Sequence, residues 1–187
     1  MINRIISEKL LGKLNKGKAV ILYGARQTGK TTLVKKLLKP FDDRVLYLNG
    51  DDSDTREFLS GYSATKLKAI FGNKTIIFID EAQRIKDIGL IIKIITDNFP
   101  DKQVIATGSS SFDLMNSVNE PLTGRKYEFM LFPLSFKEMI EHHGLMDEMR
   151  LIDFRLVYGY YPEIVTSHGE EEEVLKLLAD SYLYKDL

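Results

Sequence analysis

Short apolar runs alternate with amphipathic stretches along the chain as far as Pro133. Five runs are almost continuously apolar, as expected of parallel strands that are buried on both faces. They are Ala19–Tyr23, Val45–Leu48, Thr75–Ile79, Val104–Thr107 and Tyr127–Leu131. Apolar residues at helical spacing lie between the runs, in Thr31–Leu38, Ala64–Phe71, Ile88–Asn98 and Ser111–Asn116. Strands that alternate with helices indicate an α/β fold with a parallel sheet.

The pattern changes after Pro133, where the strand-like runs stop. Residues 135–187 have helical spacing, interrupted near three glycines. The interruptions are at Gly144, Gly159 and Gly169. We therefore expect an α/β core over residues 1–145 and a helical lid or linker over residues 146–187.

The last helical pattern begins at Glu170 with a run of acidic residues, which the helix dipole favours in a first turn. The pattern continues to Leu187 without a glycine or proline that would stop it. This favours a chain truncated before a C-terminal domain. The alternative is an ordinary terminal helix that frays at its end.

Composition and charge narrow the classes of function. Lys plus Arg is 26 and Asp plus Glu is 27 among 187 residues, which does not indicate a strongly basic nucleic-acid binder. The absence of cysteine excludes disulfides, zinc–thiolate sites, iron–sulfur clusters and cysteine nucleophiles. The first residues lack a signal-peptide pattern, and the most apolar window, residues 88–99, is too short to span a bilayer. We expect a cytoplasmic protein with no membrane association.

A phosphate-binding motif follows the first predicted strand. Residues 24–31 read GARQTGKT, which matches G-x-x-x-x-G-K-[ST]. Glycine lets the backbone curl so that its N–H groups and the next helix N-terminus face the phosphates. Lys30 is expected on the β- and γ-phosphates and the Thr31 hydroxyl on Mg²⁺. The predicted nucleotide-binding residues are Gly24, Ala25, Arg26, Gln27, Thr28, Gly29, Lys30, Thr31 and Thr32. The alternative is a glycine-rich turn with an exposed lysine.

Two acidic residues end the third predicted strand. Residues 75–81 read TIIFIDE, and a carboxylate at the carboxyl end of a parallel strand faces the ligand crevice. Asp80 is expected to hold Mg²⁺ through the water shell of the ion, near the Thr31 hydroxyl. Glu81 is expected to be the catalytic base that activates a water molecule. A solvated acidic turn is the alternative.

Further polar residues are candidates for supporting roles. Ser109, or in second place Thr107, is expected to sense the γ-phosphate, although a serine-rich helix N-cap explains the same residues. Arg125 is the candidate for stabilising the transferred phosphoryl group, in its own subunit or in a neighbouring one. The alternative is an ordinary solvated or salt-bridged surface arginine. Arg26 is expected to contact or cover the nucleotide, and Arg84 to report its state. The guanine-reading Asn-Lys-x-Asp pattern is missing, which favours ATP as the nucleotide.

Six segments, in order, resemble one group of prokaryotic AAA-superfamily ATPases. They are LYGARQTGKTTL (22–33), YLNGDD (47–52), FIDEAQRI (78–85), ATGSSS (106–111), GRKYEFMLFPLSFKEM (124–139) and YGYYPEIV (158–165). The resemblance implies a P-loop sandwich with a five-stranded parallel sheet of order 5-1-4-3-2 and a helical lid. It also implies a following C-terminal domain of unknown, nuclease-like character. Tyr160 departs from the family pattern, which has a second glycine in a GGYP-like turn.

The expected function is an ATPase that couples nucleotide state to movement of a partner or domain. The expected ligands are ATP or ADP and Mg²⁺, and the expected partner is an unknown protein or the missing C-terminal domain. A nucleotide switch without turnover is the alternative. A DNA-associated module would rest on Lys9, Lys13, Lys16 and Lys18, which a solvated helix face explains more simply. A small-molecule kinase would need an acceptor site and clamping arginines that the sequence does not display.

Overall fold

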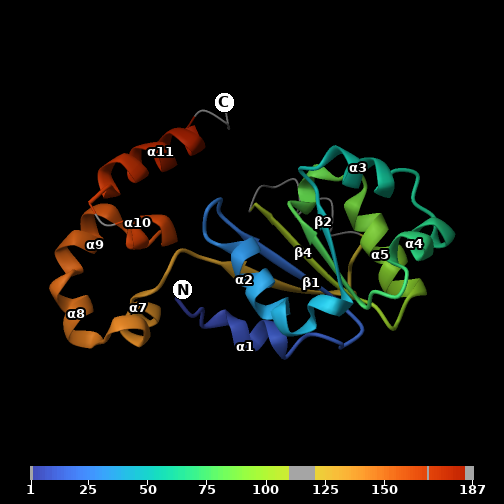
Figure 1. Ribbon diagram of the computed structural model, residues 1–187, viewed down its shortest axis with the longest axis horizontal. Coiled ribbons are helices and arrows are strands. Elements are labelled where there is room, and N and C mark those ends of the chain that lie inside the picture. Colours follow the sequence, from blue (N-terminus) through green and yellow to red (C-terminus); the bar gives the residue numbers. More distant parts are fainter. Residues whose placement is uncertain (1, 110–120, 168, 184–187) are drawn as a thin grey trace. The chain divides into compact units, whose positions relative to one another are not determined.

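A computed structural model describes residues 2–109, 121–167 and 169–183 (Figure 1). The described chain forms two compact units. One unit contains Ile6–Arg26 and Lys30–Leu131, and the other contains Met1–Ile5, Gln27–Gly29 and Phe132–Leu187. The expected division at residue 145 into core and lid stays a prediction.

A five-stranded sheet forms the centre of the first unit. Its strands are β1 (Ala19–Gly24), β2 (Val45–Asn49), β3 (Ile76–Asp80), β4 (Gln103–Ser109) and β5 (Lys126–Leu131). All neighbours pair in parallel and the order is β2-β3-β4-β1-β5. The expected strand order is thereby confirmed, as is each predicted strand. Because the strands are parallel, their carboxyl ends share one edge, where Gly24 pairs with Ser109 and Asn49 with Asp80.

Burial differs between the middle and the edges of the sheet. Every residue of β1 and β3 is buried, as their apolar sequences predict. In the part of the chain that the structure describes, β2 and β5 each pair with one strand, and some of their side chains reach solvent. Tyr47 on β2 is 40% exposed and Met130 on β5 is 38% exposed. The expectation of burial on both faces therefore holds for the middle of the sheet but not for its edges.

Helices cover both faces of the sheet (Figure 1). On one face lie α1 (Ile6–Leu11) and α2 (Lys30–Leu38), whose leucines pack against Val20 and Leu22. On the other face lie α3 (Ser53–Leu59), α4 (Ala64–Phe71) and α5 (Ile88–Asn98), which pack against Ile21 and Ile77. Alternate residues of β1 thus pack into the two hydrophobic cores, one on each face of the sheet, because successive strand side chains point to opposite faces.

The helices predicted at α2, α4 and α5 are confirmed, and α3 was not predicted. A hydrogen bond from the Asp54 backbone to the Asp52 carboxylate caps α3 at its start. Short 3₁₀ helices also form at η1 (Lys39–Arg44) and η2 (Ala82–Arg84). The helix predicted at Ser111–Asn116 lies outside the described residues.

The second unit contains mainly helices, as the sequence predicts after Pro133. They are α7 (Phe136–His143), α8 (Leu145–Arg150), α9 (Ile152–Tyr158), α10 (Pro162–Thr166) and α11 (Glu171–Leu183). The three predicted interruptions are confirmed at glycines with positive φ, namely Gly144, Gly159 and Gly169. Helix α7 begins with a reciprocal capping box between Ser135 and Glu138.

A buried carboxylate joins the helices of this unit. Glu148 on α8 is fully buried and accepts a hydrogen bond from the Tyr160 hydroxyl at 2.7 Å. Its carboxylate also lies 2.7 Å from His143 Nε2 and 3.4 Å from the buried Arg155. Burial, followed by the bond to Glu148, raises the pKa of Tyr160 to about 12. The tyrosine that departs from the expected GGYP-like turn therefore donates one of the hydrogen bonds that the buried carboxylate needs.

Candidate functional site

The segment GARQTGKT forms a curled loop between the end of β1 and the start of α2. Gln27 and Gly29 both have left-handed backbone conformations, with φ of 60° and 88°. A side chain at residue 29 would meet no atom within 4 Å, so conformation rather than space favours glycine there. A left-handed glutamine is uncommon and indicates a loop whose conformation is imposed by its surroundings.

Lys30 closes this loop onto itself. Its Nζ donates hydrogen bonds to the carbonyl oxygens of Gly24 at 2.9 Å and Ala25 at 2.8 Å. The residue is buried, and burial lowers the pKa of its ammonium group below the ordinary value. The charges of Glu81 and Asp80 oppose that shift, so both carboxylates lie close enough to act on Lys30. The cation is therefore held at the mouth of the loop beside two anions.

Among the described residues, three hydroxyl groups donate hydrogen bonds to the Asp80 carboxylate. It is buried at the end of β3, and its Oδ1 accepts a hydrogen bond from the Thr31 hydroxyl at 3.0 Å. Oδ1 also accepts a short hydrogen bond from the Thr107 hydroxyl of β4. Oδ2 accepts one from the Tyr47 hydroxyl of β2 at 3.1 Å. The two residues predicted to share a metal ion, Thr31 and Asp80, thus lie in direct contact.

Tyr47 was not among the predicted site residues. It pairs with Phe78 across the β2–β3 ladder, so Asp80 is the next residue of β3 on the same face. Burial, followed by the charge of Asp80 and its hydrogen bond, raises the pKa of Tyr47 to about 12. Lys35 of α2 lies over the tyrosine ring, 4.3 Å from its centroid. The strand order together with this spacing is the signal that could have found Tyr47.

Glu81 follows β3 in an unusual backbone conformation, with φ of 47° and ψ of 44°. Two neighbours fix it there. Gln83 Nε2 donates a hydrogen bond to Glu81 Oε2 at 2.6 Å, and Gly50 donates its N–H to the Asp80 carbonyl at 2.7 Å. A Cβ atom at residue 50 would collide with the Glu81 carbonyl oxygen, so the close approach requires glycine. The sequence did not predict positioning roles for Gly50 and Gln83.

The two sensor candidates lie at the same end of the sheet as the loop. Ser109 pairs directly with Gly24 across the β4–β1 ladder. Thr107, the second choice, contacts the Asp80 carboxylate through its hydroxyl. Both positions are compatible with the expected sensing role, and Thr107 already has a hydrogen bond that links β4 to the acidic strand end.

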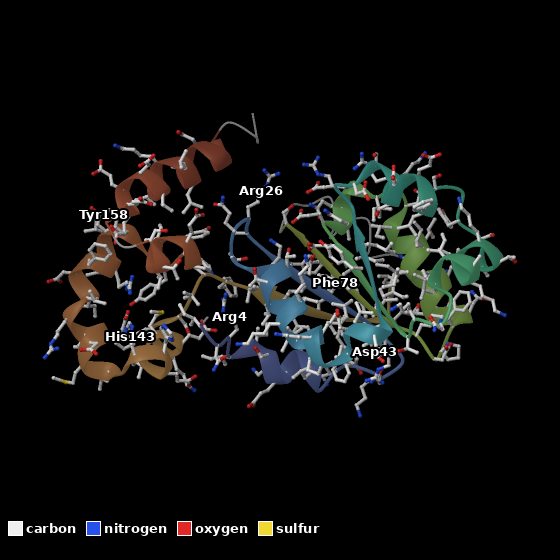
Figure 2. The ribbon with its side chains drawn as sticks, viewed as in Figure 1. Arg4, Arg26, Asp43, Phe78, His143 and Tyr158 are labelled. Atoms are coloured by element: carbon white, nitrogen blue, oxygen red, sulfur yellow. The ribbon has the colours of Figure 1, made fainter. Side chains whose placement is uncertain are left out.

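The three arginines that the sequence singled out have different surroundings. Arg26, on the loop, is close enough for its charge to lower the pKa of Lys30 (labelled in Figure 2). Arg84 lies 3.4 Å from Asp51 in an exposed ion pair. Arg125 precedes β5 and pairs with Asp97 at 2.6 Å, while its carbonyl accepts from the Ala19 N–H.

Arg125 is therefore at the amino end of the sheet. Ala19 begins β1 and Gly24 ends it, so the loop is at the opposite end of that strand. Within one chain the structure does not bring Arg125 together with Lys30, Asp80 and Glu81. Its proposed action on a neighbouring subunit stays a prediction.

Among the described residues, no helix has both the length and the apolar character needed to cross a membrane. Within the same residues, no group of three or more His, Cys, Asp or Glu side chains is placed to bind a metal ion unaided. A cation at Thr31 and Asp80 would therefore need further oxygen ligands from water or from a bound phosphate.

Comparison with known proteins finds a matching family, related sequences and a solved structure of similar fold. Residues 16–140 match the family described as AAA domain. An uncharacterized protein of Methanocaldococcus jannaschii is 26% identical over 203 residues, covering all of this chain and 45% of the relative. The replication factor C large subunit of Methanosarcina acetivorans is 35% identical over 85 residues, covering 44% of this chain and 14% of the relative. The chain thus spans less than half the length of these relatives.

Among solved structures, a chain in the structure of Drosophila ORC bound to DNA is similar in fold. The TM-score is 0.50 and the sequence identity 14%, with 71% of this chain and 92% of that chain covered. At this identity the likeness concerns the fold alone.

Proposed function

The chain belongs to the AAA domain family, and we propose that it binds ATP with Mg²⁺ and hydrolyses it to ADP and phosphate. The observation that carries this proposal is the hydrogen bond between Thr31 and Asp80, at 3.0 Å, with Glu81 next in the chain. It joins the two motifs that a P-loop ATPase needs to hold a phosphate-bound cation and to activate water.

The oxygen atoms at this position suit Mg²⁺. The ion is held in proteins by a few hydroxyl or carboxylate oxygens, with water and substrate phosphate completing its shell. Thr31 Oγ1 and Asp80 Oδ1 offer two such oxygens, and Tyr47 and Thr107 orient the carboxylate. When bound, the ion would neutralise charge on the phosphates.

Lys30 and the loop backbone would bind the phosphates. The ammonium group donates to the carbonyl oxygens of Gly24 and Ala25 and needs only to exchange these bonds for phosphate oxygens. Charge-assisted hydrogen bonds to phosphate are stronger than bonds to neutral carbonyls, so the exchange is favourable. The N-terminus of α2 adds backbone donors and a positive dipole end.

Glu81 would take the proton of the attacking water as it adds to the γ-phosphorus. The leaving ADP departs from the opposite side of that phosphorus, in line with the attack. The left-handed backbone of Glu81 and its hydrogen bond to Gln83 support this role because they restrict the carboxylate to one region. Positioned bases contribute about 10²–10⁴-fold to rates.

Coupling of ATP state to movement of a partner or of a further domain is part of the same proposal. It is supported by the extent of the relatives, which are more than twice as long as the matched region. A second candidate function is a nucleotide switch that turns over ATP negligibly. One observation favours it: Arg125 is remote from the loop within one chain, because it precedes β5 at the amino end of the sheet.

Phosphate release from ATP with Mg²⁺, measured beside a nucleotide-binding titration, tests the proposal. We expect turnover in the parent protein and a loss of about 10²–10⁴-fold in Glu81→Gln, with ATP affinity retained. Glu141→Gln, at an exposed glutamate of α7, is the matched control and should behave as the parent. Binding without turnover in every protein would establish the switch instead. Absence of ATP binding in the parent would contradict both functions.

A further inference from the structure

Arg4 is a nearly buried arginine to which the sequence assigned no role (labelled in Figure 2). Its side chain is 9% exposed, and its Nε lies 3.1 Å from Glu138 Oε1, a residue 134 positions along the chain. Nη1 donates to the carbonyl oxygen of Thr28 at 2.9 Å. Nη2 donates to the carbonyl oxygens of Phe132 and Pro133. One guanidinium thus joins the N-terminal segment, the phosphate-binding loop, the segment after β5 and helix α7.

The carboxylate of Glu138, the ion-pair partner of Arg4, accepts several further hydrogen bonds. Its Oε1 also accepts from the Ile5 N–H at 2.9 Å, and its Oε2 from the N–H and hydroxyl of Ser135 at 2.8 and 3.1 Å. Burial alone would raise the pKa of this carboxyl, but the backbone hydrogen bonds of Ser135 and Ile5 and the charge of Arg4 together lower it. An ionised carboxylate with four donors gives Arg4 a fixed anchor.

The contact with Thr28 has a direct consequence for the loop. The structure contains no cis peptide in its described part, so the Thr28 carbonyl and the Gly29 N–H point to opposite sides of one planar group. Holding the carbonyl oxygen from one side fixes the direction of the N–H on the other. Gly29, with its φ of 88°, would otherwise rotate more freely than any other residue type.

We propose that Arg4 is a positioning residue for phosphate binding, which orients the Gly29 N–H toward the nucleotide phosphates by holding the Thr28 carbonyl. The inference rests on the proposed function, since it assumes that the loop binds a nucleotide. Arg4 itself does not touch the phosphate. The planar guanidinium is needed because it binds Glu138, the Thr28 carbonyl and the segment after β5 at the same time. A lysine ammonium group cannot make all of these contacts.

The test compares Arg4→Lys and Arg4→Gln with the parent and with Arg150→Lys and Arg150→Gln. Arg150 is an exposed arginine of α8 and provides the matched control. Circular dichroism first establishes which variants fold. The Kd for ADP with Mg²⁺ is then measured by calorimetry, and the Gly29 amide resonance is followed by NMR during the titration. Arg4→Lys keeps a positive charge beside Glu138, so it serves as the variant that retains the fold if Arg4→Gln does not.

We expect folded Arg4 variants to bind ADP about tenfold more weakly, as partial loss of one charge-assisted hydrogen bond would give. The Gly29 amide should shift on ADP binding in the parent and the Arg150 variants, and much less in the Arg4 variants. A merely structural role would lower stability without changing that amide response. Wild-type affinity and a wild-type Gly29 shift in folded Arg4 variants would overturn this inference alone. Absence of ADP binding in the parent would overturn the proposed function, and this inference with it.

Discussion

The hydroxyl of Tyr47 and the carboxylate of Asp80 meet across two neighbouring strands, with 3.1 Å between the phenol oxygen and Oδ2. Asp80 receives its other two hydroxyl donors on Oδ1, from Thr31 and Thr107. Among the residues that the structure describes, Tyr47 is therefore the hydrogen-bond donor to Asp80 Oδ2. The orientation of the carboxylate depends on a residue outside both nucleotide-binding motifs.

Tyr47→Phe removes this donor and little else. We expect the free energy of unfolding to fall by about 1 kcal/mol, the usual contribution of one hydrogen bond. The Mg²⁺ concentration for half-maximal ATP binding should rise several-fold, because Asp80 gains rotational freedom. Urea unfolding and a Mg²⁺ titration measure the two effects. Tyr62→Phe, at a partly buried tyrosine packed against the core, is the control. An unchanged Mg²⁺ dependence in Tyr47→Phe would contradict the positioning role.

Lys30→Ala removes the loop's buried cation. We expect ATP affinity to fall by roughly 10²-fold or more, as loss of two charge-assisted hydrogen bonds implies. Because burial lowers the pKa of Lys30, the ammonium group does not itself favour the folded state, and the variant should remain folded. Calorimetric titration with ATP and a thermal melt measure both properties. Lys39→Ala, at an exposed lysine of η1, should bind ATP as the parent does.

Gly50→Ala tests the close approach to Glu81. The added Cβ must displace the Glu81 carbonyl oxygen, and with it the backbone that carries the proposed base. We expect the kcat for ATP hydrolysis to fall at least tenfold while the Kd for ADP changes less than threefold, since a small displacement of a catalytic group costs rate before affinity. Equal kcat in parent and variant would show that the loop after β2 yields instead.

Glu138→Gln predicts a pH-dependent loss of stability. The folded-state pKa of Glu138 lies below the ordinary value of 4.5, so its ionised form stabilises the fold above about pH 4.5. This contribution disappears as the pH falls through the lower, folded-state pKa. At pH 7 the variant should be less stable by about 3 kcal/mol, because Arg4 loses its buried counter-ion.

The difference in free energy of unfolding between Glu138→Gln and the parent should become smaller below pH 4.5. Urea unfolding from pH 7 down to pH 3.5 measures it. Glu141→Gln, on the exposed side of the same helix, should show no comparable trend. A constant difference across this range would mean that the charge of Glu138 is unimportant.

The parts of the candidate site that could be predicted from the sequence are those formed by residues adjacent in the chain. The loop at Gly24–Thr31 and the acidic pair after β3 each have a local pattern, and parallel strand ends brought Thr31 and Asp80 together as expected. Arg4 and Glu138 have no such pattern, because their contact spans 134 positions and depends on tertiary packing.

Arg125 illustrates the opposite limit. Its chemical type suits phosphoryl transfer, but it precedes β5. In a parallel sheet the amino ends of strands lie away from the ligand edge, so within one chain Arg125 is remote from the loop, and its action on a neighbouring subunit stays a prediction. Tyr160 likewise departs from a sequence pattern for a reason outside that pattern, since it binds the buried Glu148.

The contact between Arg4 and Glu138 also sets an order of events during protein synthesis. Glu138, the anchor of Arg4 on α7, is made 134 residues after Arg4. At a translation rate of about 5–20 residues per second, roughly 7–27 seconds separate the two. Once Thr31 has been made, the nascent loop has its complete GARQTGKT sequence but lacks the anchored arginine that holds Thr28 until Glu138 follows. The contact between Arg4 and Thr28 therefore gains its anchor when α7 emerges from the ribosome, and if Arg4 positions the loop as proposed, ligand affinity should rise at that point rather than when the motif itself is translated.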